Sequence, residues 1–451
     1  MFGTADDVQG SPGVPRNAAN GWYQDSELFG QSVQVTDRKA PPTIMAAYAP
    51  SLFWDGRAEG SFEDPITGAV LLPNGAALES QAAGPPLSDV EMSHIGATWP
   101  EVATQVANSI PLRLASNLPN DLAGFVAGQT YPQLFDQAFG TPEVTPARIA
   151  MALATYQRTL VPDQSPFDLD QLTPQQQMGL NIFNTQGNCN ACHGGPTFTD
   201  DTFRNIGVRP PFEDQGLGAI TGQPQDNGRF KTPSLRNVEL RAPYFHNGSA
   251  PTLLDVVEFY DRGGDFPMNQ DPQIQPLGLS PQEKAALVAF LEALTDPRVA
   301  QESAPFHRPT LYAETNLVPS EFGAGTAGSG GFVPDAVAIE PAYTGNPQLT
   351  IALADALGGA PAVLGIDLTP NFIGSELLGV DVHLGMSDQM LLLPPAPVFG
   401  PGAGQGRRST VFSLPDNPLL IGSNLYAQWF PLDPGGPLGL SASEGVQLEI
   451  F

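Results

Sequence analysis

Basic residues and long apolar runs are scarce in this chain of 451 residues. Lysine and arginine together number 19, against 47 aspartates and glutamates, which gives a formal net charge of −28. Nucleic-acid binding needs clustered cations that neutralise phosphates, so this charge balance argues against a nucleic-acid partner. No run of eighteen apolar residues occurs, and the sequence therefore predicts no membrane span. The acidic surface suits solvation or a basic protein partner.

Cysteine is equally scarce, but its placement is informative. The two cysteines are Cys189 and Cys192, and His193 follows the second directly. This Cys-x-x-Cys-His spacing is the attachment signature of haem c. Each thiol can form a thioether to one haem vinyl group, and the histidine then becomes the proximal ligand of the iron. A structural zinc site, a thioredoxin-like redox pair and a plain disulfide are competing interpretations, and the spacing favours one haem c.

The residues shown carry no export signal, although haem c is normally attached after export. Met1–Asp7 has neither a basic segment nor an apolar stretch of the kind that opens a secretory signal. We therefore expect that the natural precursor begins upstream of Met1. The haem motif places the mature protein in the periplasm or outside the cell.

Helix signals surround the haem motif. Thr173–Gln176 and Ser280–Glu283 are capping boxes, which predict helix starts before and after it, and Thr252–Tyr260 predicts a short helix that ends before Gly263-Gly264. Upstream, Trp99–Leu114 and Ala147–Leu160 are expected to be helical. The second of these should bury one face, formed by Ile149, Leu153, Tyr156 and Leu160.

The C-terminal part has a different pattern. Gly323–Gly331 has the composition of a flexible linker, and beyond it apolar residues alternate at Leu349, Ile351 and Leu353 and again at Val446, Leu448 and Ile450. The sequence thus predicts a multidomain protein in which mainly α-helical, cytochrome c-like domains precede an all-β sandwich. The expected divisions are a first domain over 1–165, a haem domain over 166–300, a linker over 301–332 and a β-sandwich accessory domain over 333–451, in which no catalytic cluster is visible.

Six short segments carry a family resemblance between about residues 30 and 296. They are Leu52–Ala58, Pro86–Met92, Cys189–His193, Phe230–Val238, Ala242–Gly248 and Pro276–Leu279. In this order they resemble the bacterial di-haem cytochrome c peroxidase family, which includes the MauG-type enzymes. The resemblance implies two cytochrome-like domains with one haem each. Residues 1–165 would then be the remnant of the peroxidatic domain, and 166–300 the domain of the electron-accepting haem.

The resemblance also implies the ligands of the electron-accepting haem. Cys189, Cys192 and His193 match its attachment site, and the family uses a distal methionine or tyrosine. Met268 lies 75 residues after His193, at about the expected place, and a thioether suits low-spin haem iron. Met268 is therefore the predicted distal ligand. Tyr244, Tyr260 and His246 are the alternatives.

Three further residues match functional positions of the family. Trp54 matches a tryptophan between the haems that is thought to relay electrons. Gln81 and Glu91 match the glutamine and glutamate beside the peroxidatic iron. A carboxylate there can move a proton between the two oxygens of peroxide, and an amide can orient the peroxide.

Two departures from the family pattern stand out. A second Cys-x-x-Cys-His motif is missing from the residues shown, so the first haem either is lost or has its motif upstream of Met1. The family also has an asparagine calcium ligand shortly before the tryptophan motif, where this chain reads Arg38-Lys39-Ala40-Pro41. A charged lysine cannot ligate calcium, although its ammonium could replace the charge of the ion. The resemblance implies calcium between the haems, but Lys39 leaves calcium binding by this chain open.

The resemblance implies a haem oxidoreductase that reduces hydrogen peroxide with electrons from a small donor protein of the cytochrome or cupredoxin type. A MauG-like oxidase of a protein or organic substrate is one alternative, and an axial tyrosine would favour it. A mono-haem electron-transfer cytochrome without peroxidase activity is the other. The sequence leaves the oligomeric state open.

Overall fold

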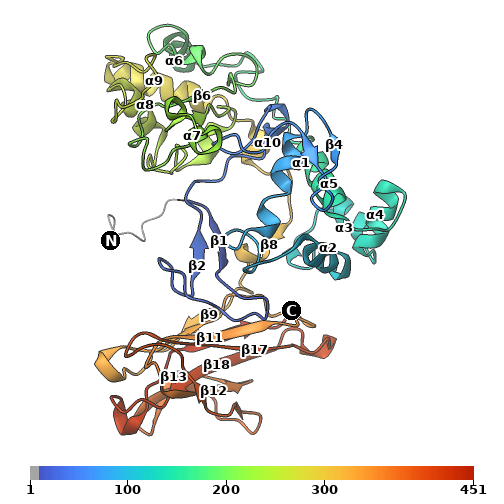
Figure 1. Ribbon diagram of the computed structural model, residues 1–451, viewed down its shortest axis with the longest axis vertical. Coiled ribbons are helices and arrows are strands. Elements are labelled where there is room, and N and C mark those ends of the chain that lie inside the picture. The colour runs from blue at the N-terminus through green and yellow to red at the C-terminus, as the bar shows by residue number, and fades with distance from the viewer. Residues whose placement is uncertain (1–9) are drawn as a thin grey trace.

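The computed structural model describes residues 10–451, which form two helical lobes and a strand-rich C-terminal module (Figure 1). The Met1–Asp7 segment considered for an export signal lies outside the described residues. Within residues 10–451, no helix has both the length and the apolar character that a bilayer crossing requires. The prediction of helical domains followed by a strand-rich domain is confirmed at this level.

The first lobe contains short helices and very short strands. Its helices are α1 (Ala77–Ala82), α2 (Trp99–Asn108), α3 (Asn120–Val126), α4 (Tyr131–Phe139) and α5 (Pro146–Gln157), and its strands are β1 (Pro12–Pro15), β2 (Val33–Val35), β3 (Phe62–Glu63), β4 (Val70–Leu72) and β5 (Ala115–Ser116). Helix α2 ends six residues before the predicted Leu114. Ser109 already has extended dihedral angles, and Pro111 follows it.

Helix α5 buries only part of the predicted face. Ile149 is buried as expected, and so is Leu160, which lies just beyond the end of the helix, but Leu153 and Tyr156 are 46% and 55% exposed. The buried positions are mainly alanines, and Ala150 and Ala154 are fully inaccessible. Small side chains let α5 approach α1 closely, so the helix presents its larger side chains to the surface. Hydrophobic periodicity alone could not show this, because alanine carries little weight in it.

The second lobe, called the haem lobe because it contains the predicted haem motif at Cys189–His193, follows the predicted helix signals closely. Its helices are α6 (Pro174–Asn184), α7 (Leu217–Thr221), α8 (Leu253–Asp261), α9 (Pro281–Glu292) and α10 (Pro297–Ala300), and its strands are β6 (Phe203–Arg204) and β7 (Phe230–Lys231). The capping boxes at Thr173 and Ser280 are present, as is one at Thr252. Phe183, Phe198 and Phe290 pack edge-on or tilted in the core of this lobe.

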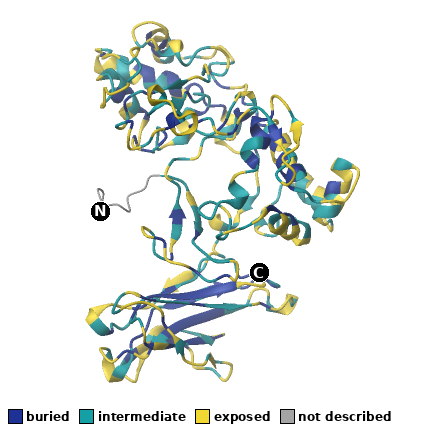
Figure 2. Ribbon diagram, in the orientation of Figure 1, coloured by how far each residue is buried: buried dark blue, intermediate teal, exposed yellow. Residues whose placement is uncertain are grey.

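The C-terminal module consists of two antiparallel sheets and a hairpin. Its strands are β9 (Ser320–Phe322), β10 (Asp335–Val337), β11 (Leu349–Ala356), β12 (Pro361–Asp367), β13 (Pro370–Leu377), β14 (Val380–Leu384), β15 (Leu391–Leu392), β16 (Ala396–Pro397), β17 (Gly406–Phe412), β18 (Asn424–Pro431) and β19 (Gly445–Glu449). One sheet has the order β10-β11-β17 and the other β15-β12-β18-β19-β9, with β16 also on β12. Ile351, Leu364 and Trp429 lie in one core between them (Figure 2).

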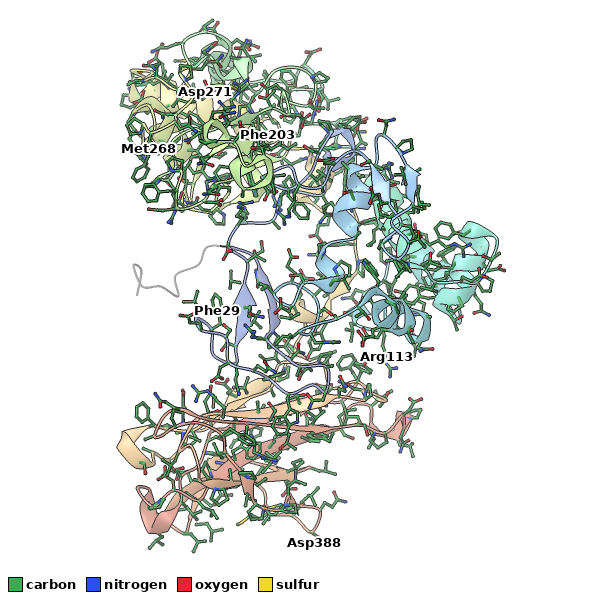
Figure 3. The ribbon with its side chains drawn as sticks, in the orientation of Figure 1. Phe29, Arg113, Phe203, Met268, Asp271 and Asp388 are labelled. Atoms are coloured by element: carbon green, nitrogen blue, oxygen red, sulfur yellow. The ribbon has the colours of Figure 1, made fainter. Side chains whose placement is uncertain are left out.

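The first lobe contacts this module at two places. The loop between β1 and β2 covers the outer face of the three-stranded sheet, where the Thr350 hydroxyl donates to the Gly21 carbonyl at 2.9 Å and the Tyr23 N–H donates to the Ser409 hydroxyl at 2.9 Å. Arg113, labelled in Figure 3, donates to the Thr344 hydroxyl at 2.8 Å. Both faces of β11 are therefore covered, which explains its almost continuous buried run.

The predicted linker over 301–332 contains regular structure in both halves, beginning with β8 (Thr310–Leu311), which pairs with β5 of the first lobe. Strand β9 pairs with β19, and Thr326 bridges to Ala442. Ser329 donates its N–H to the Asp433 carboxylate at 2.8 Å. A Cβ atom on Gly328 would lie 2.1 Å from that carboxylate. The glycines in this segment allow its backbone to lie close against the C-terminal module, whereas the composition alone indicated a flexible linker.

The contact between α6 and α9 depends on a glycine. A Cβ atom added at Gly179 would lie 2.0 Å from the Ala286 carbonyl oxygen. We expect Gly179→Ala to lower the free energy of unfolding by about 1–3 kcal/mol through overpacking, although alanine favours helix. Gly124→Ala in α3 is the matched control, because its Cβ would meet no atom within 4 Å, and it should be neutral or stabilising. Urea unfolding followed by circular dichroism distinguishes the two, and equal effects would contradict this packing.

Candidate haem site

The two cysteines lie where α6 leads into a tight turn. Asn188 has φ 46° and ψ 26°, a left-handed conformation that asparagine tolerates, and it starts the 3-10 turn Cys189–Ala191. The His193 N–H then donates to the Cys189 carbonyl at 2.8 Å. Both thiols are free in the structure. This turn places both thiols and the imidazole of His193 on the wall of one cavity.

His193 is oriented by the backbone behind it. Its Nδ1 lies 3.1 Å from the Phe198 carbonyl oxygen, so Nδ1 carries the proton and donates. Burial lowers the pKa of His193, which keeps the ring neutral. The Nε2 atom is therefore left as a lone-pair donor, the arrangement that metal-binding histidines use.

The cavity in front of His193 is large and mainly apolar. It encloses about 1400 Å³, counting its open mouth. The hydrophobic wall comes from α6, α8, α9 and the loops between them, through Phe183, Leu235, Val238, Leu253, Val256, Val257, Leu277, Leu287 and Leu291. Such a wall excludes water and suits the faces of a porphyrin.

The polar groups of the cavity also suit haem c. Arg204 and Lys231 line it, and the Arg204 Nε is buried without an acceptor, which leaves a donor for a propionate carboxylate. Burial raises the pKa of the Cys189 thiol to about 12, so this thiol is neutral at pH 7. The lining, the two thiols and the oriented imidazole together fit haem c.

Tyr260 lies on the cavity wall, and Met268 does not. Leu253, Val256, Val257 and Tyr260 are spaced i, i+3, i+4 and i+7 on α8, and all four line the cavity. Burial, together with the two cysteine thiols, raises the pKa of Tyr260. Its phenol therefore shares the cavity with the thiols.

The predicted distal ligand Met268 faces solvent instead. It is 60% exposed and lies on the outer side of the lobe (Figure 3). Its carbonyl accepts a 3.0 Å hydrogen bond from the Asn205 side chain, which fixes this loop outside the cavity. The distance along the sequence suggested Met268, but the α8 register favours Tyr260. Of the alternatives, Tyr244 and His246 also line the cavity.

Trp54 connects the cavity to the first lobe. It lines the haem cavity and also an apolar groove on its other side, formed by Pro41, Ile44, Tyr48 and Phe53 among others. Its ring lies 6.3 Å from that of His246, which stacks on Phe230 at 3.6 Å. Trp54 thus lies between the cavity and the groove, beside two other rings of the cavity wall.

Comparison with known proteins identifies the family. The family model described as di-haem cytochrome c peroxidase matches residues 16–173. The methylamine utilization protein MauG of Methylorubrum extorquens is 31% identical over 288 residues, 62% of this chain and 70% of MauG. Cytochrome c551 peroxidase of Nitrosomonas europaea is 31% identical over 301 residues, 64% of this chain and 74% of that protein. The chain belongs to the di-haem cytochrome c peroxidase family.

Coverage of the relatives is incomplete. The chain spans 59% of cytochrome-c peroxidase IdrP1 from Pseudomonas sp. strain SCT, to which it is 33% identical over 42% of its own length. A crystal structure of a MauG-like protein associated with microbial copper homeostasis shares 27% identity over 62% of this chain and 81% of that one, with a TM-score of 0.47. Membership of this family of peroxidase-like oxidoreductases rests on the likeness to the two sequence relatives, MauG and cytochrome c551 peroxidase.

Gln81 and Glu91 lie in the first lobe, away from the cavity that contains Cys189. Gln81 is in α1, and the N–H of Glu91 donates to the Ser88 hydroxyl at 3.2 Å. Neither residue lines the haem cavity or the groove beside Trp54.

The calcium site of the family does not fit this chain. Lys39 stands in place of the asparagine, and its Nζ donates to the carbonyls of Arg241 and Pro243, the latter at 2.6 Å. Burial and the nearby Arg241 charge lower the pKa of Lys39 to about 8, so it remains an ammonium at neutral pH. Two carbonyl oxygens that could ligate calcium are thus already paired with a cation.

His246 should make the stability of this lobe depend on pH. Burial lowers its pKa to about 4; Asp214 opposes this shift, and Arg38 and Arg209 reinforce it. The unfolded chain takes up this proton near pH 6.5, before the folded chain does. The free energy of unfolding should therefore fall by about 3 kcal/mol between pH 6.5 and 4.

His246→Phe can keep the stack on Phe230 and should remove that part of the pH dependence. Urea unfolding of the haem-loaded chain at pH 7 and pH 4 measures the difference between the variant and the parent. The same loss of stability in both proteins would show that His246 does not cause it.

Proposed function

We propose that the cavity holds one haem c, attached through Cys189 and Cys192, with His193 as proximal and Tyr260 as distal ligand. Bound there, the haem would supply one-electron redox chemistry at its iron. The observation that carries this proposal is the meeting of both thiols, the oriented imidazole and the Tyr260 phenol in one apolar cavity. The surrounding residues exclude water and hold the imidazole in one tautomer.

The residues around the cavity fit an oxidoreductase that handles electrons for peroxide reduction. Trp54 lies between the haem cavity and the groove of the first lobe, where it can pass electrons between them. Gln81 would orient peroxide, and Glu91 would move its proton, at a second haem. The net charge of −28 can attract a basic donor protein of the cytochrome or cupredoxin type. Haem c attachment implies a periplasmic or extracellular protein.

A MauG-like oxidase of a protein or organic substrate is the second candidate, and Tyr260 favours it. A phenolate is a harder ligand than a thioether and does not raise the haem potential as methionine does. A haem with a low reduction potential is more easily oxidised, which suits an oxidase that works from an oxidised haem. The C-terminal module, with two sheets around one core, is best interpreted as a β-sandwich accessory domain.

Substitution of Tyr260 tests the axial assignment. In haem-loaded protein, Tyr260→Phe should convert the iron from six-coordinate low-spin to five-coordinate high-spin, because the variant lacks a ligating oxygen. Tyr260→Met should restore six-coordination at a higher potential. Absorption and electron paramagnetic resonance spectra provide the readout.

Two variants serve as controls for that experiment. Tyr244→Phe removes a phenol from the same cavity, and Met268→Leu removes the thioether outside it. Both should keep the parent spectrum. If Met268→Leu changed the spin state and Tyr260→Phe did not, methionine would be the ligand.

Glu91 should matter for peroxide turnover in haem-loaded protein. Glu91→Gln should lower kcat by about 100-fold or more, because it removes a proton-transfer group. Asp89→Asn, in the same loop, is the matched acidic control and should leave kcat unchanged. Peroxide consumption with a chemical reductant measures both.

Equal rates for Glu91→Gln and the parent would remove Glu91 from the proposal. A parent protein that binds haem but does not react with peroxide would instead indicate a mono-haem electron carrier.

A further inference from the structure

Lys39 joins the Trp54 loop to the loop that carries His246. Its backbone N–H donates to the His246 carbonyl at 2.8 Å, and its own carbonyl accepts from the Trp54 indole N–H at 2.7 Å. Its side chain reaches the Arg241 and Pro243 carbonyls of the same loop. One residue therefore holds both the Trp54 indole and the backbone of the loop that carries His246.

The ammonium of Lys39 donates to two backbone carbonyl oxygens. It has no carboxylate partner among the ion pairs of residues 10–451. The nearby acids Asp55 and Asp214 are both paired with Arg38, at 2.6 Å each. A second link runs parallel, from the Arg241 guanidinium to the Ala40 carbonyl at 2.8 Å. Neutral carbonyl oxygens that point to one place are typical ligands of a hard cation such as calcium. Here the Lys39 ammonium, a compact charge with three N–H donors, occupies that place and donates hydrogen bonds to the carbonyls.

We propose that the Lys39 ammonium is an internal cation that fixes the spacing between Trp54 and the His246 loop, so that this junction needs no calcium. Lys39 is thus a positioning residue. Any effect of Lys39 on electron transfer rests on the proposed function, in which Trp54 passes electrons. The effect of Lys39 on the structure of the junction is independent of that proposal. The other two lysines, Lys231 and Lys284, are paired with carboxylates, which is the common arrangement.

Hydrogen exchange followed by mass spectrometry tests the proposal on the full chain. Peptides that cover residues 38–58 and 241–250 are compared in calcium and in a chelator. Parent protein should exchange identically in both. Lys39→Met should exchange about tenfold faster in both peptides, with or without calcium. Lys39→Asn should exchange faster only in the chelator, because the introduced amide oxygen would add a ligand beside the two carbonyls and leave room for the ion.

Lys284→Met is the matched control, since it removes a lysine that is ion-paired outside this junction, and it should exchange like the parent. Parent-like exchange in Lys39→Met, slower exchange of the parent in calcium, or fast exchange of Lys39→Asn in calcium would each overturn the proposal. If the Lys39 side chain only filled space, calcium would not restore slow exchange in Lys39→Asn.

The haem absorption of the same samples separates the two proposals. A colourless protein refutes the haem site, while the exchange pattern still decides the role of Lys39. If Lys39→Met does not fold, Lys39→Asn in calcium and in chelator gives the decisive comparison.

Discussion

The hydrogen bond between His193 Nδ1 and the Phe198 carbonyl is the constraint on which the haem lobe depends. It selects one tautomer, and the free Nε2 can then serve as a ligand. The turn at Cys189 holds the thiols beside that ring, and α8 and α9 complete an apolar wall. If the His193 imidazole rotated freely, its Nε2 would no longer be held in the cavity that the thiols and Tyr260 also line.

The sequence predicted local features of this lobe well, because they depend on short-range chemistry. The capping boxes at Thr173 and Ser280 and the haem motif all involve residues within one turn of each other. The place of Met268 outside the cavity was harder to foresee, because separation along the chain does not determine which loop reaches the cavity. The i, i+7 relation of Leu253 and Tyr260 indicates that both line one wall, and the proposed role of Tyr260 rests on that relation.

Long-range packing was beyond sequence reasoning. The alanine face of α5 and the glycine contact at Gly328 both depend on what approaches from elsewhere in the chain. The coverage of β11 by the loop that contains Gly21 and Tyr23 is a contact across more than 300 residues. Alternating apolar residues could indicate strands, but not that an N-terminal loop would complete their burial.

The proposed function depends on one haem being covalently bound through Cys189 and Cys192. The intact mass of this chain, after expression with haem-attachment machinery, tests this beside a Cys189→Ala/Cys192→Ala double variant. The parent should have the mass of the polypeptide plus one haem, and the variant the bare polypeptide mass. A parent chain at its apo-protein mass, or a variant that still carries covalent haem, would contradict it.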